Sequence, residues 1–211
     1  MKRGAIEGRV RDLGHEADAV GETERGLVLA AGALPGERVA LSGVARSGGV
    51  TRAKDLRVIA PSPEREEPAC ALALRCGGCP LMIASDALEA AHKIARVERA
   101  LPATPRGELP PLTLERAGDR LGYRRRARLA FHGRSLGYRA RRERRVVDVP
   151  RCVVLRPELE AALALARAEL APRWEGEGEL HLALGPGGLP VVAMVTEQPQ
   201  PPALYEAFRA A

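Results

Sequence analysis

Four cysteines are the residues of this sequence whose type and spacing could do chemistry. They are Cys70, Cys76, Cys79 and Cys152, so three fall within ten residues and the fourth lies 73 positions later. Four thiolates can hold a metal centre, and tetrahedral zinc and an iron–sulfur cluster are the two that fit best. Disulfides are the minor alternative, because Met1 to Arg9 contain no apolar signal segment that would direct the chain to an oxidising compartment.

The residues around the third cysteine favour a cluster over zinc. Gly77 and Gly78 let the backbone turn tightly around a bulky group, with amides that point at sulfur. Pro80 follows Cys79, as proline follows one ligand in bacterial ferredoxins. Structural zinc sites more often contain two CxxC pairs, whereas Cys152 stands alone. We therefore expect an iron–sulfur cluster, with zinc as the alternative that spacing leaves open.

A second chemical feature is the arginine-rich segment from Arg116 to Arg151. It contains 13 arginines and no lysine against three carboxylates, in a chain with a net charge of +6. The planar guanidinium fork suits phosphate, and interleaved apolar residues place the arginines on strands. This segment predicts a polyanion-binding face rather than a merely solvated one. The candidate RNA-binding residues are Arg124, Arg125, Arg126, Arg128, Arg139, Arg141 and Arg142. Aromatic residues make up only 3%, which argues against a base-stacking platform.

The elements that must position these residues indicate an α+β protein of two domains. Short apolar runs separated by glycine turns predict strands, and such strands suggest a small closed OB-like β-barrel over residues 1–60. The predicted strands are Ala5–Leu13, Gly26–Ala31, Glu37–Ser42 and Thr51–Ile59. A proline-rich charged linker at Pro61–Pro68 then marks a boundary, and residues 61–211 form a mixed α/β central domain that carries the cluster.

Within residues 61–211 the periodicity predicts two helices and a hairpin. One helix spans about 86–101, with Asp86 as its cap and Glu89 completing a capping box. A second begins near Pro157 and runs to Leu170, and a hairpin pairs Glu179–Leu184 with Leu189–Val195 around a glycine-rich turn. No apolar run approaches the length of a membrane span, so we expect a soluble cytoplasmic protein.

Together these features make the whole chain resemble the RNA (uracil-5-)-methyltransferases of the RumA/TrmA type. The spacing Cys70-x5-Cys76-Gly-Gly-Cys79 with distant Cys152 is similar to that family's [4Fe–4S] motif. Ala33–Glu37 resembles the "ALPGE" of its N-terminal TRAM domain, a small RNA-binding barrel, and Leu136–Arg139 resembles its "LGF" strand. The resemblance implies that the four cysteines ligate the cluster. Two motifs depart: Pro80–Ile83 stands where the family has Gln-Leu-Gln-His, and Tyr123–Arg125 where it has Tyr-Arg-Asn.

The resemblance also implies a catalytic half that this sequence does not display. Family members continue into an S-adenosylmethionine-binding domain whose cysteine attacks C6 of uracil. No cysteine follows Cys152 here, and the glycines at 185–188 form a hairpin turn rather than a cofactor loop. We therefore predict no catalytic residue in this chain, which would be inactive alone. It would be the RNA-binding and [4Fe–4S]-bearing portion of a 23S rRNA (uracil-5-)-methyltransferase, with rRNA preferred over tRNA as partner.

Two other functions remain as alternatives. The chain could be a stand-alone RNA-binding iron–sulfur module, or one subunit of a split enzyme whose partner supplies the catalytic domain. A zinc-bearing RNA-binding protein without enzymatic ancestry is the third interpretation.

Overall fold

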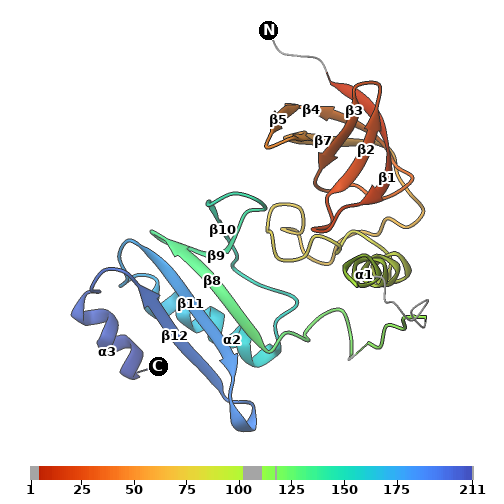
Figure 1. The fold of residues 1–211 in the computed structure, drawn as a ribbon. Helices are drawn as coiled ribbons and strands as arrows, with labels where there is room; N and C mark the ends of the chain where they lie inside the picture. Colours follow the sequence, from red (N-terminus) through yellow and green to blue (C-terminus); the bar gives the residue numbers. More distant parts are fainter. Residues whose placement is uncertain (1–4, 102–110, 117, 211) are drawn as a thin grey trace. The chain divides into compact units, whose positions relative to one another are not determined.

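The computed structural model describes residues 5–101, 111–116 and 118–210, and they form two compact units (Figure 1). The first unit comprises Met1–Pro68 and Cys79–Glu115, and the second comprises Ala69–Gly78 and Arg116–Ala211. Division into domains at 1–60 and 61–211 stays a prediction. Among the described residues, no helix is both long and apolar enough to cross a membrane.

A curled seven-stranded sheet makes up most of the first unit (Figure 1). Its strands are β1 (Ile6–Leu13), β2 (Ala19–Thr23), β3 (Gly26–Ala30), β4 (Arg38–Ser42), β5 (Ala45–Ser47), β6 (Val50–Arg52) and β7 (Asp55–Ala60). Their order is β5-β6-β3-β2-β1-β4-β7, antiparallel except for the β3–β6 pair. β5 and β7 end this order, so closure into a barrel is not confirmed for the described strands.

Alternation of apolar residues explains why these segments form strands around one core. Ile6 and Val10 of β1 are buried, and Val39 of β4 is fully enclosed against them. Two details of the sequence prediction were wrong. β2 and β5 were missed, and the run predicted at Thr51–Ile59 is divided between β6 and β7, because the chain turns at Ala53 and Lys54.

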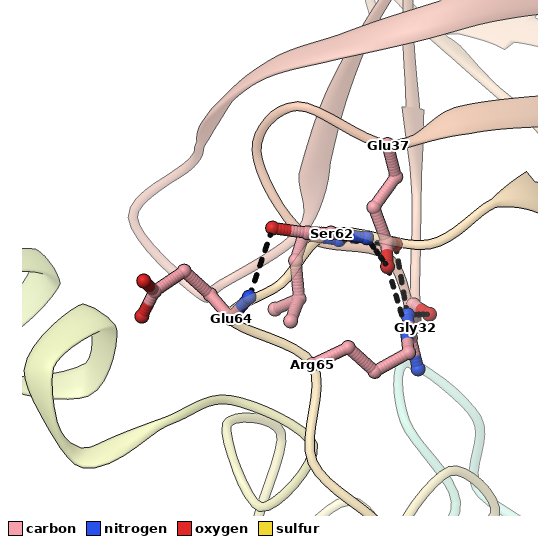
Figure 2. Close-up of polar contacts among 6 residues, drawn as sticks. Gly32, Glu37, Ser62, Glu64 and Arg65 are labelled. Carbon is pink, nitrogen blue, oxygen red and sulfur yellow. Dashed lines mark hydrogen bonds and ion pairs between the residues drawn. The ribbon is translucent and has the colours of Figure 1, made fainter.

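The predicted linker after β7 is hydrogen-bonded to the sheet through Glu37, whose side chain is fully buried (Figure 2). One carboxylate oxygen accepts from the Ser62 amide at 3.1 Å and from Arg65 Nε at 2.6 Å. The other accepts from the Leu34 amide at 2.8 Å and from Arg65 Nη2 at 2.9 Å. Arg65 also donates to the Gly32 carbonyl at 2.8 Å. Residues 62–65 are therefore part of the first unit's structure.

Helix α1 (Asp86–Ala100) completes the first unit, and its cap differs from the prediction. Ser85, not Asp86, caps the helix by accepting a hydrogen bond from the Leu88 amide at 3.1 Å. Glu64 in turn accepts a hydrogen bond from the Ser85 hydroxyl. Just before the cap, Ile83 packs with Leu34 in a small apolar cluster. The apolar departure from the family motif at residue 83 therefore contributes to the core of this unit.

The second unit is a five-stranded antiparallel sheet with helices on one face (Figure 1). Its strand order is β10-β9-β8-β11-β12. The strands are β8 (Arg126–His132), β9 (Ser135–Arg139), β10 (Val146–Asp148), β11 (Glu177–Leu184) and β12 (Pro190–Thr196). Helix α2 (Pro157–Leu165), the π-helical turn η1 (Ala166–Leu170), the 3₁₀ turn η2 (Pro186–Gly188) and helix α3 (Pro202–Ala210) complete it. The predicted hairpin is confirmed, and the predicted second helix becomes π-helical after Leu165.

The core of the second unit lies between α2 and the sheet. Leu129 and Phe131 of β8 are buried, as are Leu159 and Leu163 of α2. Trp174 stacks on Phe131 with ring centroids 4.5 Å apart, and its indole nitrogen donates to the Gly133 carbonyl at 2.7 Å. These helices cover one face of the sheet, which leaves the other face available for a ligand.

Candidate metal centre and nucleic-acid interface

Residues 69–78, which we name the cysteine loop, are held against strand β9 by backbone contacts. Cys76 forms an isolated β-bridge with Ala140, and the Gly77 amide donates to the Arg139 carbonyl at 3.2 Å. A Cβ atom at Gly77 would lie 2.8 Å from that carbonyl oxygen, closer than real Cβ atoms come. Glycine is therefore required where the cysteine loop meets β9, a role that the cysteine spacing alone did not show.

Cys152 is positioned by the segment between β10 and α2. It is buried, its amide donates to a Glu160 carboxylate oxygen at 3.0 Å, and its carbonyl accepts from the Leu155 amide at 3.0 Å. The same Glu160 carboxylate forms an ion pair with Arg151. Glu160 therefore fixes the backbone of a candidate ligand, a role that the sequence alone does not show.

The electrostatics of Cys76 place three thiols in one neighbourhood. Burial raises the pKa of the Cys76 thiol, and the nearby Cys152 and Cys70 thiols raise it further. The Gly78 amide, which donates to Cys76 Sγ at 3.4 Å, and the Arg124 guanidinium act in the opposite direction. A thiol whose ionisation is disfavoured in this way, as that of Cys76 is, is stabilised as a thiolate when a cation binds it.

Cys79 belongs to the first unit, and its carbonyl accepts a hydrogen bond from the Met82 amide at 3.3 Å. Because it follows Cys76 by three residues, the extended backbone between them reaches at most about 10 Å. Among all residues that the structure describes, no group of three or more His, Cys, Asp or Glu side chains is arranged around a single metal ion. The predicted ligand set therefore stays a prediction.

Three of the predicted RNA-binding arginines share the open face of the five-stranded sheet. Arg126 and Arg128 are two residues apart on β8 and both are exposed. Ala130 of β8 lies opposite Gly137 of β9, and directly paired residues point to the same face. Arg139, two residues beyond Gly137 and exposed, therefore extends from that face as well.

The remaining predicted arginines differ in their surroundings. Arg125 is exposed just before β8, while Arg141 and Arg142 lie in the turn between β9 and β10. Arg124 is half-buried, and its backbone amide donates to the Val154 carbonyl at 2.8 Å. The structure thus places Arg124 beside the thiols rather than on the open face.

A carboxylate compensates part of the positive charge on this face. Glu179 forms an ion pair with Arg128 at 2.6 Å and contacts His181 at 2.9 Å. Hydrogen bonds from Arg128 and His181 lower the pKa of Glu179 to about 2. Arg126 and Arg139 are consequently the better candidates for direct phosphate contact on the open sheet face.

Comparison with known proteins relates this chain to a group of RNA-modifying enzymes. No family model matches it. The 23S rRNA (uracil(1939)-C(5))-methyltransferase RlmD of Pectobacterium carotovorum subsp. carotovorum is 33% identical over 211 residues, covering 95% of this chain and 46% of the relative. The enzyme of the same name from Chromohalobacter salexigens is 35% identical, with 95% and 44% covered. This chain is related to RNA uracil-C5-methyltransferases. It spans less than half the length of these curated relatives.

A solved structure supports the fold. The tRNA (uracil-54, C5)-methyltransferase of Pyrococcus abyssi, in complex with S-adenosyl-L-homocysteine, matches with a TM-score of 0.68 and 20% identity. The match covers 96% of this chain and 48% of the other. The mixed α/β fold is therefore shared, and the predicted relation to uracil methyltransferases is supported by sequence similarity along nearly the whole chain.

Proposed function

We propose that this chain is the RNA-binding and [4Fe–4S]-bearing portion of an S-adenosylmethionine-dependent 23S rRNA (uracil-C5)-methyltransferase. The observation that carries the proposal is its similarity, over 95% of its length, to proteins named for methylation of 23S rRNA. The chain would contribute RNA binding through the basic sheet face and cluster ligation through its cysteine thiols.

Three features of the second unit fit an iron–sulfur cluster. The Cys152 and Cys70 thiols lie near enough to Cys76 to raise the pKa of its thiol, and the Gly78 amide already donates to Cys76 Sγ. The Tyr138 hydroxyl is buried and lacks a hydrogen-bond partner among the described residues. In a [4Fe–4S] cluster each thiolate binds a different iron, so its ligands need not converge on one point. The four cysteines would hold the cluster, which when bound would cross-link the cysteine loop to the segment around Cys152.

The arginines on the open sheet face would hold the RNA backbone. Guanidinium groups bind phosphate through paired hydrogen bonds, and such contacts orient an RNA without reading its sequence. Arg126 and Arg139 would make these contacts, while Glu179 keeps Arg128 in place. This division of labour predicts binding that is strong at low salt and tolerant of sequence.

Methyl transfer itself would need groups other than the four cysteines and the arginines of the sheet face. Attack on C6 of uracil needs a free thiolate, which makes C5 nucleophilic enough to accept the methyl group before a base removes the C5 proton. All four cysteines of this chain are assigned to the cluster. We therefore expect no labelled methyl transfer from S-adenosylmethionine to uracil by the 211-residue chain alone.

The cluster is tested by chemical analysis of anaerobically purified chain. We expect about four irons and four acid-labile sulfides per chain, as the cluster formula requires. Cys76→Ser should lose both, because it removes a ligand. The exposed Ser47, changed to Ala, is the control and should retain both. Stoichiometric zinc without sulfide would contradict the proposal.

The RNA-binding face is tested by a salt series with an rRNA fragment. Arg126→Gln and Arg139→Gln should each weaken binding and reduce the slope of log affinity against log salt by about 1, because each removes one phosphate contact. Arg173→Gln is the matched control, since Arg173 follows η1 and is paired with Glu169. Equal slopes for all four proteins would refute a role for this face.

A further inference from the structure

Tyr138 places beside the thiols a hydroxyl that has no hydrogen-bond partner among the described residues. Its ring extends from β9, and its hydroxyl oxygen is fully buried without a hydrogen bond among the described residues. Burial raises the pKa of this hydroxyl, the neighbouring Cys152 thiol raises it further, and Arg124 opposes both. The hydroxyl thus lies within electrostatic reach of Cys152 and Arg124, yet neither forms a hydrogen bond of ordinary geometry with it.

Arg124 is the second polar group at this place, and its backbone is hydrogen-bonded on both sides. Its amide donates to the Val154 carbonyl at 2.8 Å, and its carbonyl accepts from the Arg156 amide at 3.0 Å. Its guanidinium contacts the Tyr123 hydroxyl at 3.4 Å and lies 5.8 Å from the centre of that ring. A half-buried, anchored arginine whose charge acts on Cys76 is poorly suited to follow a mobile RNA strand.

A buried hydroxyl without a partner is unfavourable unless a ligand supplies the missing acceptor. Thiolate sulfur and cluster sulfide are acceptors, and both carry negative charge that a guanidinium stabilises. The buried Cys152 thiol, the half-buried Cys76 thiol, the unpaired Tyr138 hydroxyl and the Arg124 guanidinium therefore complement one another only when the sulfur atoms are charged. None of these groups lies on the open sheet face that we assign to RNA.

We propose that Tyr138 and Arg124 are positioning residues of the cluster, an inference that rests on the proposed [4Fe–4S] centre. The Tyr138 hydroxyl donates a hydrogen bond to the sulfur of Cys152, and the Arg124 guanidinium balances the negative charge of the thiolates and sulfides. Both contacts favour the more negative, reduced form of a cluster, so they raise its reduction potential.

The test compares Tyr138→Phe with Tyr123→Phe in the full 211-residue chain, purified without oxygen. Phenylalanine is the residue of the family's "LGF" strand, so the ring packing at 138 is retained while the hydroxyl is removed. Iron, acid-labile sulfide and the midpoint potential are measured, the last by titration with dithionite followed by electron paramagnetic resonance. We expect full iron content in both variants and a more negative midpoint potential for Tyr138→Phe only, because that variant loses one hydrogen bond to a charged sulfur.

A second pair of variants tests the charge without removing the hydroxyl. Arg124→Gln should shift the midpoint potential in the same direction, and Arg124→Lys should restore most of the shift because it keeps the positive charge. A merely structural role for Arg124 would make glutamine and lysine equally harmful to folding and leave the potential of the remaining cluster unchanged. If Tyr138→Phe loses its iron, this pair still decides the inference.

The outcomes separate the two proposals. Cluster-bearing wild-type protein whose potential is unaffected by Tyr138→Phe and by Arg124→Gln would overturn the positioning role and leave the cluster standing. Wild-type protein with neither iron nor sulfide would overturn the cluster, and the positioning role with it. RNA affinity that falls in Arg124→Gln with an unchanged potential would return Arg124 to the RNA-binding face.

Discussion

Two buried polar clusters, one in each unit, are built around an arginine and differ in whether they are complete. In the first unit, both oxygens of the buried Glu37 carboxylate accept hydrogen bonds, and Arg65 is matched to them (Figure 2). In the second unit, Arg124 lies near the Cys76 thiol, whose pKa is raised, and near a Tyr138 hydroxyl without a hydrogen-bond partner among the described residues. The hydrogen bonds of the first cluster are all made within the protein. In the second cluster, the Tyr138 hydroxyl stays unpaired among the described residues and the cysteines are candidate ligands.

This difference shows how a static structure can distinguish a structural network from a binding site. A structural network closes its hydrogen bonds internally, because any unpaired buried group would cost stability. A site for a charged ligand contains polar groups without hydrogen-bond partners, and these groups lower the stability of the fold until the ligand binds. Breaking the first cluster should therefore lower the stability of its unit directly. Altering the second should change the properties of the ligand that it binds.

The largest expected effect is the replacement Glu37→Gln in the closed cluster. It leaves Arg65 without its counter-charge in a mostly buried position, so the first unit should lose about 3 kcal/mol of stability. The only tryptophan, Trp174, reports on the second unit, so the first unit should be followed by hydrogen exchange of the amides in β1 and β4. Glu24→Gln removes an exposed ion pair with Arg25 and should leave exchange unchanged. Equal exchange in both variants would contradict the closed-network interpretation.

The same cluster predicts a pH dependence for the first unit. Burial alone would raise the pKa of Glu37, but Arg65 and the amides of Leu34 and Ser62 outweigh it and hold the pKa below 4.5. The stabilisation by ionised Glu37 is therefore complete above about pH 4.5 and is lost as the pH falls through the lower, folded-state value. The difference in stability between wild type and Glu37→Gln should shrink on acidification below pH 4.5. A constant difference down to pH 2 would show that the carboxylate charge is not what stabilises the unit.

A smaller effect is expected where the cysteine loop meets β9. Gly77→Ala places a Cβ against the Arg139 carbonyl and should cost the second unit about 1–3 kcal/mol, because the backbone must shift. Unfolding in urea, followed by Trp174 fluorescence, measures this loss. Gly78→Ala is the matched control, since a Cβ there would meet no atom closer than 3.5 Å. Similar losses in both variants would mean that the close approach at Gly77 is unimportant.

The sequence allowed the local parts of this fold to be predicted, because their signals lie within a few residues. β3, α1 and the β11–β12 hairpin agree closely with the predictions made from apolar periodicity and glycine turns. β2 was missed because Gly21 and Glu22 interrupt its apolar pattern. The cap of α1 was misplaced by one residue, because Ser85 and Asp86 are both good cap residues and their partners decide between them.

The candidate ligands could be proposed from the sequence and stay a prediction, whereas their supporting groups could not be proposed from it. Cysteine spacing is visible in sequence, and so is the density of arginines. The burial of Arg124 and the isolated Tyr138 hydroxyl depend on contacts with Val154 and Cys152, which are distant in sequence. The Glu37–Arg65 pair spans 28 positions and resembles ordinary surface charges until the fold brings the two together.

The Glu37–Arg65 pair also determines where this chain can be cut if its first sheet is to be moved into another protein. A cut after β7, where the strands end at Ala60, would separate the buried carboxylate from Ser62 and Arg65 and leave it with the Leu34 amide alone. Recombination or gene fusion that moved the sheet without residues 61–65 would leave the buried Glu37 carboxylate without its arginine partner. Residues 61–65 therefore complete the hydrogen bonding of the sheet that precedes them. A transplanted sheet needs these residues to keep Glu37 paired.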